Sequence, residues 1–252
     1  MTRVSPLRAV TLTHNVLLKQ LITKGRLIGI TIFGLLPILL GWVIGRQSND
    51  PLEAGAGFIS YMGLSILIPV VALIFASASL GDTREDGTLV YLWLRPISRL
   101  SVTGGAWAAS AVITLPLTVI PMTIAAILLD VGSALIVATI LTSVLAVLAY
   151  CGIFLLLGLL VKNPVIWGLA YIFIWEAIVA SFAKPAAALA VSGYSRAIIT
   201  GRTGVDFDFL FSPPQSISIF MLIVIMAVSM LSLIHISEPT RPERKWYAVF
   251  CL

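Results

Sequence analysis

Side chains that could carry out chemistry are few in this chain of 252 residues, and they lie far apart. Cys151 lies inside an apolar run and Cys251 is next to last, so neither a disulfide framework nor a zinc-ligand spacing exists. His14 has no catalytic or metal-ligand cluster around it and is interpreted as a polar-face histidine. The sequence contains neither a GxxxxGKS/T phosphate loop nor a GxSxG elbow. We therefore predict no enzyme activity, cofactor or metal in this chain itself.

Glu176 is the one ionisable residue deep inside an apolar run, between Trp175 and Ala177. A carboxylate at membrane depth is costly and faces the bundle interior, a partner or a water-filled cavity. One interpretation is substrate contact or gating in a translocation path. The other is a structural carboxylate hydrogen-bonded to a neighbouring span. We favour the structural role, because no other charge within the spans could form a proton relay with Glu176.

The segment Gly81–Arg99 reads GDTREDGTLVYLWLRPISR and holds the densest group of polar residues between two apolar runs. Its acidic start suits a helix N-terminus, Leu89, Leu92 and Trp93 supply an apolar face, and Pro96 ends the helix. The pattern predicts a short amphipathic helix parallel to the membrane. Such a helix either rests on lipid or receives a soluble partner, and the residues alone do not favour one over the other.

The apolar runs must position these groups. Apolar residues make up 59% of the chain and charged residues 11%, against about 45–50% and about 25% in soluble domains. Because about 20 residues of helix cross the hydrocarbon, the runs predict an all-α integral membrane protein, a six-span helical bundle. The expected spans are Leu27–Gly45, Phe58–Leu80, Gly104–Leu129, Ala134–Val161, Pro164–Phe182 and Ile217–Met230.

The charges around the spans predict an orientation. Residues 1–26 are expected to form a basic amphipathic helix on the membrane surface, facing anionic lipid headgroups. Nine Lys and Arg residues lie in segments on the N-terminal side and four on the other, which favours a cytoplasmic N-terminus. The basic residues form no continuous stripe, so no nucleic-acid partner is expected. In the long outer segment Lys184–Gln215, residues Val191–Ile199 are expected to form a short amphipathic helix.

The last 22 residues are expected to be foreign. Leu231–Arg241 reads LSLIHISEPTR, which resembles a conceptual translation of the transposase adapter used in short-read sequencing libraries. We therefore interpret 231–252 as non-native fused sequence rather than an ordinary tail. The transmembrane domain is then 27–230, with a truncated sixth span of 14 residues, too few to cross a membrane alone. The apolar residues Leu231–Ile236 are expected to complete that span.

The segment Gly81–Arg99 resembles the inner loop of type-2 ATP-binding-cassette (ABC) exporter permeases, in the six-span group whose ATPase is a separate polypeptide. The resemblance consists of an acidic–Gly–Thr element, a Leu-rich turn and an Arg-Pro-x-x-Arg element. The matching positions are Glu85, Gly87, Thr88, Leu92, Arg95, Pro96 and Arg99. The overall plan is also similar, from the basic amphipathic N-terminus to the long outer loop before the last span.

The resemblance implies a function. In that family the inner loop is a cytoplasmic coupling helix seated in a groove of the ATPase. It implies an exporter permease subunit in a prokaryotic plasma membrane, partnered by an ABC ATPase that binds ATP and Mg²⁺ and by a second permease copy, identical or different. The alternative is a non-transporting membrane anchor or assembly factor whose inner helix binds another soluble protein. The substrate is not readable from the sequence.

Overall fold

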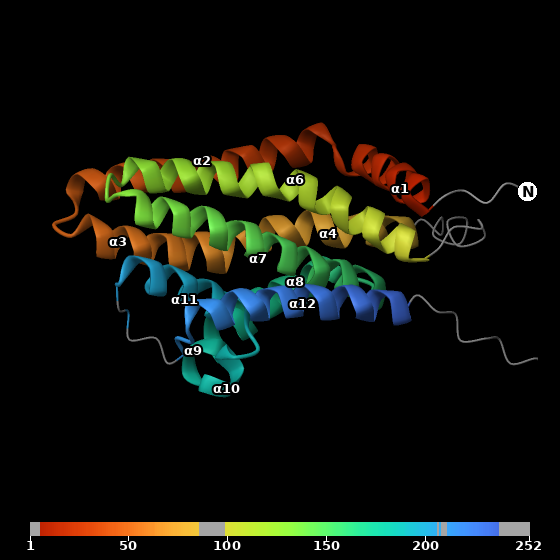
Figure 1. Cartoon of the computed structure of the whole chain (residues 1–252). Coiled ribbons are helices and arrows are strands. Elements are labelled where there is room, and N and C mark those ends of the chain that lie inside the picture. The colour runs from red at the N-terminus through yellow and green to blue at the C-terminus, as the bar shows by residue number, and fades with distance from the viewer. Residues whose placement is uncertain (1–5, 86–98, 206, 208–210, 237–252) are drawn as a thin grey trace, which may run out of the picture.

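The computed structural model of the chain describes residues 6–85, 99–205, 207 and 211–236, and this part consists of helices without any strand (Figure 1). Six helical stretches are long and apolar enough to cross a membrane: Lys24–Gln47, Pro51–Arg84, Leu100–Leu128, Ser133–Leu160, Pro164–Phe182 and Gln215–His235. The predicted all-α bundle with six candidate membrane spans is therefore confirmed.

Two of the spans are compound helices that contain a π-helical stretch. In chain order the helices are α1 (Pro6–Leu21), α2 (Lys24–Gln47), α3 (Pro51–Phe58), η1 (Ile59–Leu67), α4 (Ile68–Glu85), α6 (Arg99–Leu128), α7 (Ser133–Leu160), α8 (Pro164–Ala170), η2 (Tyr171–Val179), α9 (Ala180–Phe182), α10 (Lys184–Ala187), α11 (Val191–Thr203) and α12 (Gln215–Ile236). The second span runs continuously through α3, η1 and α4, and the fifth through α8, η2 and α9.

The second span and α7 form the centre of the bundle. Of their most apolar windows, 67% and 56% of the residues are buried, against 22% in the first, fifth and sixth spans. Small residues allow α4 and α7 to approach closely, since a Cβ added at Gly158 would lie 2.6 Å from the carbonyl oxygen of Ser77. The outer spans present apolar side chains such as Ile166, Trp167 and Phe220 on the surface, as lipid contact requires.

The N-terminal helix α1 exists as predicted, but it does not lie on the membrane surface alone. Leu17 and Leu21 on its apolar face are buried, and α1 packs along α6. Gly105 of α6 permits this contact, because an added Cβ would lie 2.9 Å from Thr13 Cβ. The exposed large apolar residues in the described part of α1 are instead Leu12 and Val16. The face of α1 that carries Leu17 and Leu21 therefore packs against the protein.

The long segment after the fifth span folds back onto the bundle. The expected helix at Val191–Ile199 forms the first nine residues of α11, but all nine are buried, so it is not a surface amphipathic helix. It packs against α7, α12 and η1. In Figure 1 α11 lies beside one end of α12, at the end of the bundle opposite to α1. This fold-back brings the start of α11 to the fifth span.

The sixth span is completed as the sequence suggested. Helix α12 runs without a break from Gln215 to Ile236, and Leu233 is fully buried against the core. The residues after Met230 therefore continue the helix that the preceding residues begin. Their foreign origin stays a prediction, since a helix of the right length and hydropathy does not reveal where its sequence came from.

Candidate functional site

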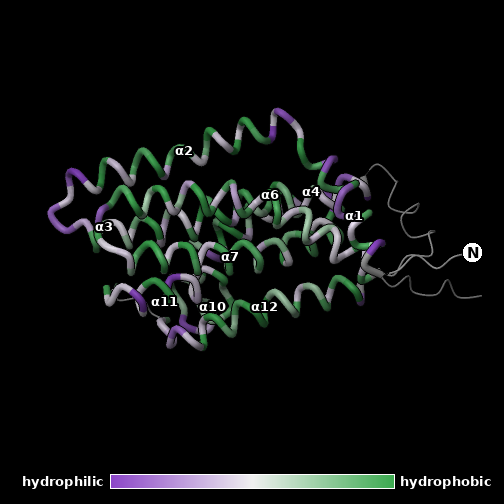
Figure 2. The backbone as a smooth tube through the Cα atoms, turned by 45° about the horizontal axis from the view of Figure 1, so that its top comes forward, coloured by the Kyte–Doolittle hydropathy of each residue, from purple (hydrophilic) through white to green (hydrophobic). Residues whose placement is uncertain are grey.

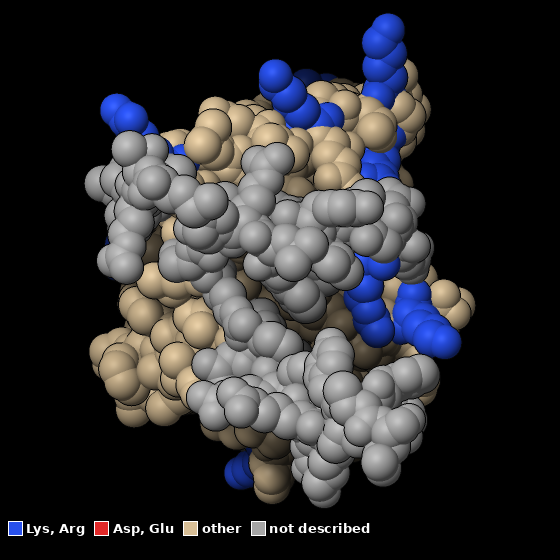
Figure 3. Space-filling view, turned by 90° about the vertical axis from the view of Figure 1, so that its right-hand side faces the viewer, with Lys and Arg blue, Asp and Glu red and all other residues tan. Residues whose placement is uncertain are grey.

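The two ends of the bundle differ in charge. The end that carries α1, here called the basic end, has the described cations Arg8, Lys19, Lys24, Arg26, Arg84 and Lys162, against the described acid Asp82. Figure 3 looks at this end and shows Lys and Arg side chains around its rim. The opposite end mixes signs, with exposed Arg46, Lys184, Arg202, Asp50, Glu53 and Asp130. Figure 2 shows hydrophilic residues collected at the two ends and around α10 and α11.

The sequence-predicted coupling segment joins two helix ends at the basic end. Glu85 is the last residue of α4 and Arg99 the first of α6, and both helices reach the basic end there. The other site positions predicted for this segment, Gly87, Thr88, Leu92, Arg95 and Pro96, lie outside the described residues. Their roles therefore stay predictions.

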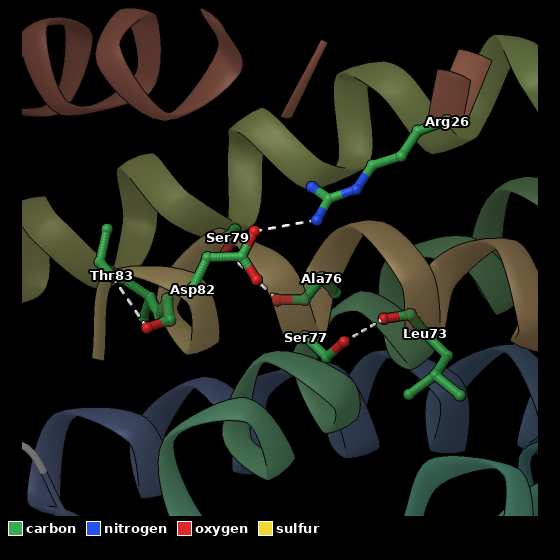
Figure 4. Close-up of polar contacts among 8 residues, drawn as sticks. Arg26, Leu73, Ala76, Ser77, Ser79, Asp82 and Thr83 are labelled. Atoms are coloured by element: carbon green, nitrogen blue, oxygen red, sulfur yellow. Dashed lines mark hydrogen bonds and ion pairs between the residues drawn. The ribbon is translucent and has the colours of Figure 1, made fainter. Parts of the chain in front are cut away.

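The start of this segment differs from the prediction. Gly81–Glu85 is not the first turn of a new helix but the last turn of α4. Asp82 therefore lies near a helix C-terminus, where the backbone dipole disfavours an acid. Arg26 at the start of α2 compensates for this, because its Nη2 donates to Asp82 Oδ2 at 3.0 Å, as Figure 4 shows. The ion pair joins the first and second spans at the basic end.

Arg84 forms a second attachment of the same turn. Its Nη1 donates to the carbonyl oxygen of Leu159 at 2.7 Å and to that of Val161 at 3.1 Å. These carbonyls belong to the C-terminal end of α7, where backbone acceptors lack partners within the helix and a cation is favourable. The last turn of α4 is thus held to α2 on one side and to α7 on the other.

Glu176 lies in η2 and holds the N-terminus of α11. Its side chain has no exposed surface, and Oε1 accepts hydrogen bonds from Tyr171 Oη at 2.7 Å and Val191 N–H at 3.0 Å. Oε2 accepts from Ser192 N–H at 2.9 Å. Val191 and Ser192 are the first two residues of α11, whose N-cap Ala190 has no side chain able to cap them. Glu176 supplies that cap from another helix, and its negative charge suits the positive end of the helix dipole.

The π-helical geometry of η2 explains the contact within the fifth span. Tyr171 and Glu176 are five residues apart, and i→i+5 pairing of a π-helix brings such positions together. The geometry agrees with a structural role of Glu176. The partner is α11 and the residue's own helix, however, and not the neighbouring span that the sequence interpretation named. Contact of Glu176 with a substrate stays an untested prediction.

Two further groups beside Glu176 were missed by sequence reasoning. The hydroxyl of Tyr150 is buried and has no hydrogen-bond partner within the described part of the chain. Arg196 is 8% exposed; its Nη2 donates to Ser192 Oγ at 2.9 Å, and its guanidinium lies 5.9 Å from the ring centre of Tyr61. The one sequence signal for this contact was the position of Arg196 four residues after Ser192, which places both on one face of a helix. The burial of Arg196 depends on the fold-back of α11.

The described residues contain no group of three His, Cys, Asp or Glu side chains placed to bind a metal ion. What the arrangement does chemically is to hold helix ends: Glu176 holds α11, Arg84 holds α7 and Asp82 holds α2. In comparisons with known proteins, no family model matches the chain and no curated sequence matches it. What sequence and structure establish together is a helical bundle with six candidate membrane spans.

Proposed function

We propose that this chain is the membrane-spanning permease subunit of an ABC transporter, an exporter driven by a separate ATPase. The basic end is assigned to the cytoplasm of a prokaryotic cell, because short segments rich in Lys and Arg stay on that side of the plasma membrane. A second permease copy completes the transporter in this proposal. ATP and Mg²⁺ bind to the ATPase partner and not to this chain.

The observation that carries the proposal is the anchoring of the inner segment. The residues that resemble the coupling loop follow directly after a turn that is tied to two other helices through Asp82 and Arg84. A docking segment that transmits force needs a rigid base, since a loosely held base would absorb the movement of the partner. A segment that merely rests on lipid has no such need. This anchoring favours a segment that docks a partner over one that rests on lipid, and the resemblance of the segment favours an ABC ATPase as that partner.

The test is a charge reversal at the edge of the segment, Glu85→Lys. Because Glu85 is the last residue of α4, a lysine there interacts favourably with the helix dipole, so the change does not weaken the helix. Losing one partner of a buried charged pair at an interface costs about 2–5 kcal/mol, or at least roughly thirtyfold in affinity. We expect the variant to insert normally and to lose co-purification with its proposed ABC ATPase partner.

Glu53→Lys is the matched control, because it makes the same substitution at an exposed position of α3 at the opposite end. Binding and stimulated ATP hydrolysis should be unchanged in the control. If Glu85→Lys and Gly87→Pro leave both quantities unchanged as well, the segment does not dock an ATPase. The non-transporting anchor or assembly factor would then be the better interpretation.

A further inference from the structure

Two adjoining hollows open between α2, α4 and α8 near the basic end. The first has a volume of about 330 Å³, and its polar lining consists of Arg26, Ser77, Asp82 and Asn163. The second, of about 290 Å³, is lined almost wholly by apolar atoms of α2 and α4. Arg26 and Ile74 line both, so the two hollows lie side by side; together they are here called the groove, with a polar end and an apolar end. Each is about the size of the smaller ligand pockets in proteins.

The polar end offers both signs of charge. The Arg26 and Asp82 side chains are 33% and 36% exposed, so the ion pair is accessible from the hollow. Their mutual bond uses Arg26 Nη2 and Asp82 Oδ2. Within the described part of the chain, the remaining guanidinium N–H groups and Asp82 Oδ1 have no other hydrogen-bond partner. A ligand group with an anionic and a cationic part could therefore be bound at both.

The apolar end is kept open by two glycines. A Cβ added at Gly25 or Gly29 of α2 would meet no atom within 4 Å. On the same helix Gly41 is packed against α6, where an added Cβ would lie 3.0 Å from Ala125. Gly25 and Gly29 thus do not serve close helix packing. They leave room beside an apolar wall formed by Ile30, Phe33, Val70, Val71 and Ile74.

We propose that this groove binds one phospholipid whose head group carries both a phosphate and an ammonium. The phosphate would accept from Arg26 and the ammonium donate to Asp82, while one acyl chain lies along Gly25 and Gly29. The chemistry fits a phospholipid. The groove is lined by apolar residues within the first and second spans and by charged residues near the ends of these spans. The proposal rests on the membrane-spanning bundle and goes beyond the proposed transport function, since a lipid bound here does not require an ATPase.

The test measures lipid retained by the purified chain. The protein is delipidated in detergent, equilibrated with phosphatidylethanolamine or phosphatidylglycerol, and analysed by native mass spectrometry. We expect one phosphatidylethanolamine per chain, and weaker retention of phosphatidylglycerol, which lacks the ammonium. Arg26→Gln should reduce retention roughly tenfold or more, as expected for the loss of a hydrogen bond to a charged group.

Gly29→Leu tests the apolar end without disturbing helix packing, because the new side chain points into open space. It should abolish retention, whereas Gly104→Leu should not, since Gly104 is equally unencumbered and lies on α6 outside the groove. Melting temperatures of both variants should match that of the unmodified chain. Full retention in Gly29→Leu, equal loss in Gly104→Leu, or equal retention of the two lipids would overturn the proposal.

Discussion

Removing the carboxylate of Glu176 should release α11 from the bundle. Glu176→Ala leaves Val191 N–H, Ser192 N–H and Tyr171 Oη without their acceptor, at a site where both N–H groups are buried and Tyr171 is half-buried. Each unsatisfied buried group costs about 1–3 kcal/mol, and at the lower limit the three together cost roughly 3 kcal/mol. The strain can be relieved if α11 lifts away locally, so the cost is expected in the opening of this helix before global unfolding.

The magnitude predicts graded behaviour. A loss of roughly 3 kcal/mol raises the open population of α11 about 100-fold. Glu176→Gln keeps the shape and one accepting oxygen, but its amide nitrogen cannot accept from Ser192 N–H. Leaving Ser192 N–H without an acceptor costs about 1–2 kcal/mol, so the open population of α11 should rise roughly tenfold.

Thiol labelling measures this opening. Ser195→Cys places a probe at a fully buried position of α11. Of the two native cysteines, Cys251 is replaced by serine, and Cys151 is buried. The maleimide reaction rate should follow the order Ala, Gln, Glu at position 176. Glu53→Ala, which removes an exposed carboxylate of α3, should leave the rate unchanged. An unchanged rate in Glu176→Ala would show that the carboxylate does not hold α11, and the structural role would be wrong.

Further predictions concern the clamp, the core and the orientation. Arg84→Ala should lower stability by about 1–3 kcal/mol, seen as a lower melting temperature, because two carbonyls of α7 lose a charged donor, and an unchanged melting temperature would contradict the clamp. Gly158→Leu should prevent accumulation of folded protein, since its side chain would collide with Ser77, and normal yield would refute this contact. Cysteines at the exposed positions Lys162 and Gly201 should differ toward an impermeant reagent on intact cells, with labelling at position 201 only; the reverse pattern would invert the proposed orientation.

The spans were predictable because charge-free length alone decides whether a helix can cross a membrane. Their ends were less so. The second span begins at Pro51, seven residues before the predicted Phe58, because Asp50 accepts from Glu53 N–H and proline suits the first helical turn. The sequence analysis had placed the start of the span at Phe58, beyond the exposed acid at position 53. The N-cap at Asp50 therefore starts the helix earlier than the start expected from composition.

The contacts of the candidate site were mostly beyond sequence reasoning. Glu176 was recognisable as a buried acid, but its partners at the start of α11 depend on a chain reversal that no residue pattern encodes. The bonds of Arg84 to the end of α7 join residues at least 75 positions apart. The pair Arg26 and Asp82 was more accessible to inference, because both flank spans that end on the same predicted side. The sequence does not show which spans contact one another.

The two halves of the first span, α2, are attached to the bundle in different ways. Beyond Pro37, its half at the opposite end is fixed to α6 through close glycine contacts at Gly41 and Gly45. The half at the basic end borders the groove, and Figure 2 shows α2 diverging from α6 toward that end. Its tip is held to α4 by the partly exposed pair of Arg26 and Asp82, which contributes about 0–1 kcal/mol.

So small a restraint is comparable with thermal energy, and Pro37 removes a backbone hydrogen bond between the two halves. The buried side chain of Ile30 and the close approach of Gly34 to Pro121 of α6 still hold the middle of this half, so the weak attachment is confined to its first turns. A pull on the last turn of α4 would reach these first turns through a single ion pair. The first span thus joins a closely packed outer part to lightly held first turns at the basic end, in one continuous helix.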